Sequence, residues 1–106
     1  MKGDRVGEFE ELTLLAVRAL GEHAYAVAVQ QFLEHRTSRD VAMGAVYAAL
    51  DRLERKGYLR SAFGDATPVR GGKRKRVFEA TRQGLRTAQT VRRVREAIWK
   101  VIEEQR

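Results

Sequence analysis

A cluster of basic side chains is the part of this 106-residue chain best suited to chemistry. Five of the seven residues from Arg70 to Arg76 are Arg or Lys. Guanidinium and ammonium groups donate hydrogen bonds to phosphate oxygens and attract a polyanion at longer range. The net charge of +7 is uneven, since residues 1–40 carry −2 and residues 41–106 carry +9. The second part of the chain is therefore expected to contact a polyanion, although such a run can also be a solvated loop.

The stretch from Val41 to Arg60 predicts a helix with a second set of basic groups. Val46, Leu50 and Leu53 are spaced i, i+4 and i+7, so one stripe of this helix is expected to enter a core. Gly57 is expected to end the helix in the left-handed conformation. The opposite face is small, polar and mostly basic, and it comprises Gly44, Ala48, Asp51, Arg52 and Arg55. A short helix with such a face suits a DNA groove.

Catalytic and metal-binding chemistry find little support. The chain has no cysteine, which excludes disulfides and thiolate metal sites. His23 and His35 are expected at opposite ends of one helix, about 18 Å apart, so they cannot share a metal within one chain. No serine has a plausible histidine partner. We therefore expect no enzyme, metal or cofactor.

The N-terminal sequence is too acidic for a secretory signal, and the apolar run from Ala24 to Val29 is too short to cross a bilayer. These features predict a soluble, cytoplasmic protein without a membrane partner.

Two further helices are expected before the basic one. The first begins at Glu8 and closes at Gly21; its apolar face comprises Phe9, Leu12, Thr13, Ala16 and Leu20, widened by Leu15 and Ala19. The second is predicted from Tyr25, Ala28, Val29, Phe32 and Leu33. The polar turn Arg36–Asp40 follows, with Asp40 as a candidate N-cap for the third helix. Two helices joined by a short turn predict a helix-turn-helix.

A β-hairpin and a final helix complete the chain. The strands are expected at Tyr58–Phe63 and Lys75–Ala80, and the helix from Thr81 onward. The apolar residues of this helix are Leu85, Ala88, Val91, Val94, Ile98, Trp99, Val101 and Ile102. Their heptad-like spacing is too short for an independent coiled coil, so this helix must pack on something. Together with the apolar first helix, it predicts a dimer.

The chain resembles the PadR family of bacterial transcriptional regulators. The resemblance spans Glu8 to about Ile102, and its most specific residues are Gly44-Ala45-Val46-Tyr47, Leu50 to Gly57, Pro68 to Arg76, Phe78, Thr81 and Gly84. It implies a mainly α winged helix-turn-helix with a small β-hairpin and a long C-terminal dimerisation helix. The expected division is a flexible N-terminus at 1–7, a DNA-binding domain at 8–80 and a dimerisation helix at 81–106.

The resemblance also implies roles for particular residues. Tyr47 corresponds to a tyrosine that helps hold the recognition helix on the phosphate backbone, although it could instead be a core aromatic. Arg52 could contact DNA or pair within the chain. The set expected at the DNA is Met43, Gly44, Tyr47, Ala48, Arg52, Arg70, Lys73, Arg74, Lys75 and Arg76. Two residues depart from the family pattern: Ala26 replaces a glycine, and Ala42 replaces a capping serine.

Taken together, these features predict a homodimeric regulator, more specifically a repressor, that binds a palindromic operator in double-stranded DNA. The alternative is a winged helix that contacts proteins instead of DNA. Trp99 is expected to anchor the dimer interface, and the resemblance implies that it could also stack on a small aromatic effector there.

Overall fold

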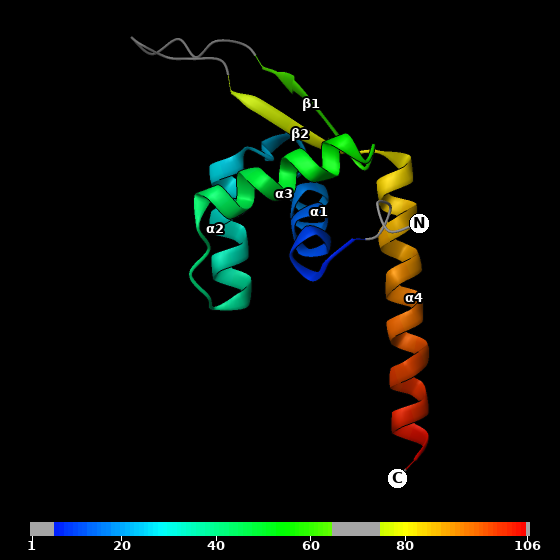
Figure 1. Cartoon of the computed structure of the whole chain (residues 1–106). Coiled ribbons are helices and arrows are strands. Elements are labelled where there is room, and N and C mark those ends of the chain that lie inside the picture. The colour runs from blue at the N-terminus through cyan, green and yellow to red at the C-terminus, as the bar shows by residue number, and fades with distance from the viewer. Residues whose placement is uncertain (1–5, 65–74, 106) are drawn as a thin grey trace.

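The computed structural model describes residues 6–64 and 75–105. Its elements, in chain order, are α1 (Glu8–Leu20), the short 3-10 helix η2 (Gly21–His23), α2 (Ala26–Thr37), α3 (Met43–Arg55), β1 (Leu59–Phe63), β2 (Arg76–Ala80) and α4 (Arg82–Glu104). The two strands pair as an antiparallel hairpin, with Leu59 opposite Ala80 and Phe63 opposite Arg76. In Figure 1, α1, α2 and α3 lie together beside the hairpin, and α4 extends away from them. The predicted mainly α fold with a small hairpin and a C-terminal helix is confirmed.

The hydrophobic core lies between the first three helices and the hairpin. Val46, Leu50 and Leu53 of α3 are each at most 1% exposed, as their spacing predicts. Leu14 and Val17 of α1 are equally buried, although they lie outside the apolar face predicted for that helix. The reason is that α1 packs against α2, α3, β2 and α4. A helix surrounded on several sides buries more than one stripe.

The entry into α3 corrects one prediction, because Asp40 does not cap this helix. The N-cap residue is Ala42, and no side chain makes a capping hydrogen bond. Two side chains of α2 hold the entry instead. Gln30 Nε2 donates to the carbonyl of Val41 at 2.8 Å, and Glu34 Oε2 accepts from the Val41 amide at 3.0 Å. Both backbone groups of Val41 are thereby satisfied, and the position of α3 against α2 is set without a cap.

The boundaries of α2 also differ from the prediction. Tyr25 is its N-cap rather than its first turn, and the helix continues to Thr37, so part of the expected polar turn is helical. Ser38 ends the helix with φ 56° and ψ 34°. His23 consequently lies in η2 and not at one end of α2.

The end of α3 follows the prediction. Gly57 has φ +81°, and its amide donates to the carbonyl of Glu54 at 3.0 Å. The amide of Tyr58 donates to the carbonyl of Leu53 at 2.9 Å. This pair of bonds is the Schellman motif, which satisfies the last carbonyls of a helix. It places Tyr58 in the core directly before β1.

The first turn of α4 packs against Gly57 and Tyr58, the two residues that follow α3 in the turn described above. Thr81 is the N-cap of α4, and its Oγ1 accepts from the Gly84 amide at 3.0 Å. The same hydroxyl donates to the carbonyl of Gly57 at 2.7 Å, while the Thr81 amide donates to the carbonyl of Tyr58 at 3.0 Å. A Cβ atom at position 84 would lie 2.2 Å from the Tyr58 carbonyl oxygen. Only glycine therefore fits at this contact between two backbones.

A mostly buried carboxylate connects α1 to the end of α3. Glu10 accepts a hydrogen bond from Lys56 Nζ at 2.9 Å and another from the Gly7 amide at 3.2 Å, and Arg52 Nε lies 3.7 Å away. Burial alone would raise the pKa of the Glu10 carboxyl. The hydrogen bonds from Lys56 and Gly7 and the charges of Lys56 and Arg52 outweigh burial, so the pKa is lowered. The fold therefore stabilises ionised Glu10.

We expect Glu10→Gln to lower the free energy of unfolding at pH 7 by about 1–3 kcal/mol, because it removes a charged acceptor from a part-buried site. A lowered pKa means that this stabilisation is present above the unfolded pKa of about 4.3 and is lost as the pH falls through the folded pKa. Urea unfolding of both proteins should give curves that converge as the pH falls below the unfolded pKa and through the lowered folded pKa of Glu10. Glu8→Gln is the control, since Glu8 shares the first turn of α1 but is exposed. A constant difference between wild type and Glu10→Gln at all pH values would contradict the assignment.

Gly84→Ala should destabilise the protein by about 1–3 kcal/mol, because the new methyl group must displace the Tyr58 backbone. Thermal unfolding measures the effect. Gly44→Ala is the matched control, since a Cβ at position 44 would meet no atom within 4 Å. Equal melting temperatures for Gly84→Ala and wild type would show that α4 does not need this contact.

Candidate nucleic-acid interface

The exposed face of α3 is the first part of the candidate interface. Gly44, Tyr47, Ala48 and Arg52 are all exposed, as predicted, whereas Met43 is half-buried and packs against the core. Tyr47 is 53% exposed, so it is not the core aromatic that its spacing from Leu50 also allowed. The small residues leave the helix backbone accessible between the larger side chains.

A hollow of about 490 Å³ joins this face to α2 and β2. It is open to solvent, and its lining residues are Tyr25, Ala26, Val27, Ala28, Gln31, Tyr47, Lys75, Arg76 and Phe78. The first turn of α2 borders it, and the N-cap Tyr25 makes no side-chain capping bond. Lys75 Nζ lies 4.7 Å from the centroid of the Tyr25 ring. A helix N-terminus and an ammonium group beside one hollow produce a positive potential that favours phosphate.

Arg52 has a partner within the chain. Its Nε lies 3.7 Å from Oε2 of Glu10, which also receives Lys56. The partner is thus on α1, so the prediction that Arg52 could pair within the chain is confirmed. The Arg52 side chain is still nearly half exposed. It can reach a ligand, but with part of its charge already balanced.

Arg76 has more partners still. It pairs with a Glu54 carboxylate oxygen on the last turn of α3, and its Nε donates to Ser61 Oγ at 3.0 Å. Its guanidinium carbon also lies 4.8 Å from the centroid of the Phe78 ring. The remaining basic residues predicted at the DNA, Arg70, Lys73 and Arg74, lie outside the described residues.

The apolar residues of α4 fall into two groups. Ala88 is buried in the core of its own chain, and Leu85 and Val91 are half-buried. Ala88 is therefore not available to a partner in the way that we expected. The remaining residues are exposed, namely Val94, Ile98, Trp99, Val101 and Ile102. These five residues form the outer apolar face of α4.

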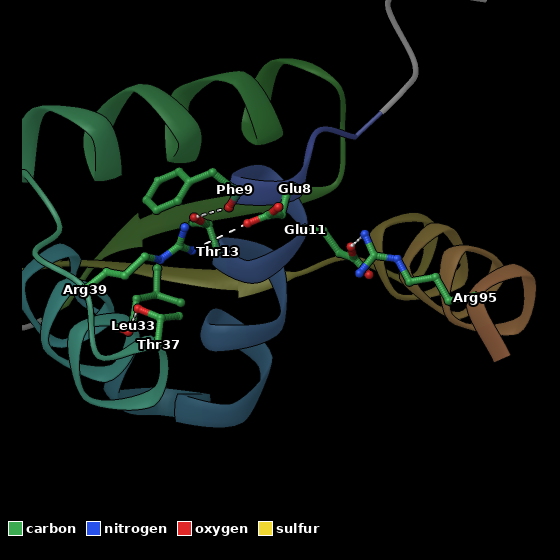
Figure 2. A network of polar contacts seen from close by, with 8 residues as sticks. All are labelled: Glu8, Phe9, Glu11, Thr13, Leu33, Thr37, Arg39 and Arg95. Carbon is green, nitrogen blue, oxygen red and sulfur yellow. Dashed lines mark hydrogen bonds and ion pairs between the residues drawn. The ribbon is translucent and has the colours of Figure 1, made fainter. Parts of the chain in front are cut away.

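An ion pair marks the boundary between the two groups. Arg95 Nη2 of α4 forms an ion pair with Glu11 Oε1 of α1 at 2.8 Å, as Figure 2 shows. Glu11 is buried, whereas Arg95 is more than half exposed. Beyond this pair, α4 extends past the rest of the chain (Figure 1).

Other kinds of site are not found in residues 6–64 and 75–105. No group of three His, Asp or Glu residues there is arranged to hold a metal ion, and both histidines are exposed. No helix within these ranges is long and apolar enough to span a membrane.

Several residues at these contacts were missed from the sequence. Glu54 and Arg76 are 22 positions apart, and Glu11 and Arg95 are farther apart still. No local spacing rule connects such pairs. The only available signal was the presence of acids on helices whose expected face was otherwise apolar or basic.

Comparison with known proteins agrees with this architecture. The model of the transcriptional regulator PadR-like family matches residues 14–90. The chain therefore belongs to the PadR-like family of transcriptional regulators. A comparison with curated proteins found no match.

Solved structures share the fold at low sequence identity. A PadR-like transcription factor from Bacteroides fragilis is 24% identical, with a TM-score of 0.69 over 92% of this chain and 84% of that one. A transcriptional regulator from Clostridium thermocellum is 21% identical, with a TM-score of 0.70 over 91% and 88%. A PadR family regulator from Clostridium difficile is 20% identical, with a TM-score of 0.69 over 91% and 96%. These likenesses establish a winged helix with a C-terminal helix, and the family establishes a transcriptional regulator rather than an enzyme.

Proposed function

We propose that this regulator is a homodimeric repressor that binds a two-fold symmetric operator. The observation that carries the proposal is that Tyr47 on the exposed face of α3, the first turn of α2 and Lys75 beside the hairpin border one hollow. α3 would enter the major groove, where its small residues allow close approach. The hollow and the wing, defined as residues 70–76, would contact the flanking phosphates.

The outer apolar face of α4 supports the dimer. Five large apolar side chains are exposed along this part of the helix, including Trp99 at 62% exposure. A monomer of this size seldom exposes so many on one element, and a second copy would cover them. Two-fold symmetry then requires half-sites about one or two helical turns apart.

Occupancy of the operator by the dimer would by itself repress transcription. A dimer with two recognition helices in successive grooves covers the duplex between them and excludes other proteins from it. Where the operator overlaps a promoter, polymerase is excluded too. Footprinting on the promoter of its own gene and on neighbouring promoters tests this, and protection only outside promoter elements would contradict a repressor.

A winged helix that contacts proteins remains the alternative function. The uneven charge argues against it, because the centres of protein interfaces are depleted of lysine. Binding to random duplex DNA at two salt concentrations separates the two functions. A DNA-binding protein should lose affinity steeply as salt rises, whereas a protein-binding module should show no affinity at either salt.

Trp99 could also stack on a flat aromatic effector at the dimer interface. To regulate binding, such a ligand must favour one spacing of the two recognition helices over another. Titration of flat aromatic compounds with the single tryptophan as the fluorophore would detect this. Quenching without a change in operator affinity would exclude an effector role.

Replacing Arg70, Lys73, Arg74 and Lys75 by Ala should weaken binding to operator and random duplex by similar factors. Each lost phosphate contact should reduce the slope of log K against log salt by about 0.9, as anisotropy titrations can measure. Four Ala substitutions at Arg86, Arg92, Arg93 and Lys100 of α4 provide a charge-matched control. A wing variant that kept its slope but lost its preference for the operator would identify the wing as a reader of bases.

Trp99→Ala should raise the dimer dissociation constant and weaken operator binding with it, because one assembly holds both half-sites. Truncating a buried aromatic costs about 3–5 kcal/mol, which is ample to detect by sedimentation. Phe63→Ala is the control, since Phe63 is as exposed as Trp99 but lies on the hairpin. A tryptophan emission maximum like that of the free amino acid, unchanged on dilution through dissociation, would rule out the interface placement.

A further inference from the structure

Arg76 differs from the other basic residues near the hairpin in how its charge is used. Its guanidinium pairs with one oxygen of the Glu54 carboxylate, and its Nε donates to Ser61 Oγ at 3.0 Å. Ser61 Oγ in turn donates to the other Glu54 oxygen at 2.7 Å. The three side chains form a closed ring of hydrogen bonds, which we call the Arg76 network.

The register of the hairpin explains why these groups meet. Ser61 lies opposite Phe78, and Arg76 lies two residues before Phe78 on the same strand. Side chains two residues apart on a strand share a face, so Arg76, Phe78 and Ser61 share one face of the hairpin. Phe78 is buried in the core, and Arg76 lies over its ring. That face of the hairpin is thus directed toward the helices, and Glu54 approaches it from the last turn of α3.

Arg76 and Lys75 differ in whether a carboxylate balances their charge. The network contains one cation and one anion, so its net charge is close to zero. Lys75 is exposed, and its described contact is with the aromatic ring of Tyr25 rather than with a carboxylate. Binding of a polyanion by counterion release depends on unbalanced cations. A cation that is already paired with an anion therefore contributes little to counterion release.

We propose that Arg76 is a positioning residue, which holds the hairpin strands β1 and β2 at a set angle to α3 through Glu54 and Ser61, and does not neutralise a phosphate. The inference rests on the proposed DNA-binding function. Fixing these strands before DNA arrives reduces the ordering cost of binding, so the network raises affinity without touching the ligand. Glu54 is a positioning residue by the same argument.

Glu54→Gln provides the decisive test, because the two roles of Arg76 predict opposite signs. If Arg76 positions the hairpin strands, removing its partner should weaken binding to the operator by roughly tenfold, equivalent to about 1.4 kcal/mol. If Arg76 binds phosphate, the same variant removes a negative charge and releases a cation, so binding should strengthen. Anisotropy titrations of operator and random duplex at several salt concentrations measure both affinity and slope.

Three further variants complete the experiment. Arg76→Gln and the double variant Glu54→Gln/Arg76→Gln should each weaken binding by the same factor as Glu54→Gln, since any one change opens the network. The slope of log K against log salt for the double variant should equal that of wild type, because the proposal places neither side chain on a phosphate. Glu79→Gln is the matched control, since Glu79 pairs with Arg60 across the same two strands but on the other face. That control should not weaken binding.

A fourth measurement excludes a merely structural effect. Lys75→Gln should reduce the salt slope by about 0.9 in wild type but by less in the Glu54→Gln background, because the start of β2, next to Lys75, is no longer held in place. Melting temperatures identify any variant that fails to fold, and the double variant then carries the comparison. Stronger binding by Glu54→Gln, or an equal Lys75 effect in both backgrounds, would overturn the proposal. If wild type binds neither duplex, the proposed function fails instead, and the two failures are distinct.

Discussion

The backbone contact between Gly84 and Tyr58 is the constraint on which the geometry of the whole chain depends. α4 is long and touches the rest of the protein mainly near its start, so a small change of direction there would be magnified along its length. Gly84 removes the side chain that would separate the two backbones, and the Thr81 hydroxyl is bonded on both sides of the contact. A contact made by backbone atoms cannot relax by a change of rotamer. The direction of α4 is therefore set by the position of the turn after α3.

That turn lies at the end of the recognition helix, and several other contacts meet there. Glu54 forms an ion pair with Arg76 of β2, and Lys56 forms one with Glu10 of α1. The carbonyl of Gly57 accepts a hydrogen bond from the Thr81 hydroxyl. The last turn of α3 is thus bonded to the wing strand, to the first helix and to the C-terminal helix at once. A force applied to any of these elements is transmitted to α3 over a few bonds. If the protein binds DNA as the proposed dimer, groove contact and subunit spacing would both depend on these contacts.

Local periodicity predicted the elements well, because the buried faces of α3 and the hairpin obey simple spacing. Val46, Leu50 and Leu53 are buried as predicted, and Gly57 ends α3 with a positive φ. The predictions were wrong where side chains distant in the sequence make the contact that a local residue was expected to make. Asp40 was a reasonable cap, but Gln30 and Glu34 of α2 hold Val41 instead. Glu10 and Glu11 lie in the first turn of α1, yet both are buried and pair with Lys56 at the end of α3 and with Arg95 of α4. Ala88 has the same spacing as the residues expected at the dimer interface, but it packs within its own chain. Spacing alone does not show whether one face of a helix packs on its own chain or on a partner.

The outer apolar face of α4 limits how a ligand bound there could regulate the protein. Leu85, Ala88 and Val91 pack at least partly on their own chain, while the exposed apolar side chains begin at Val94, next to Arg95, and include Trp99. In the proposed dimer, a ligand at Trp99 would alter the operator affinity by changing the angle between the two α4 helices, because Trp99 is exposed and lies far along α4 from its first turn. The Glu11–Arg95 pair resists bending within one chain, so such a change would occur between subunits. To shift the spacing of the recognition helices from mostly one state to mostly the other, a ligand would need about 5.5 kcal/mol of differential affinity. Several buried aromatic contacts are required to supply that amount, and a single stacking contact with Trp99 would be insufficient.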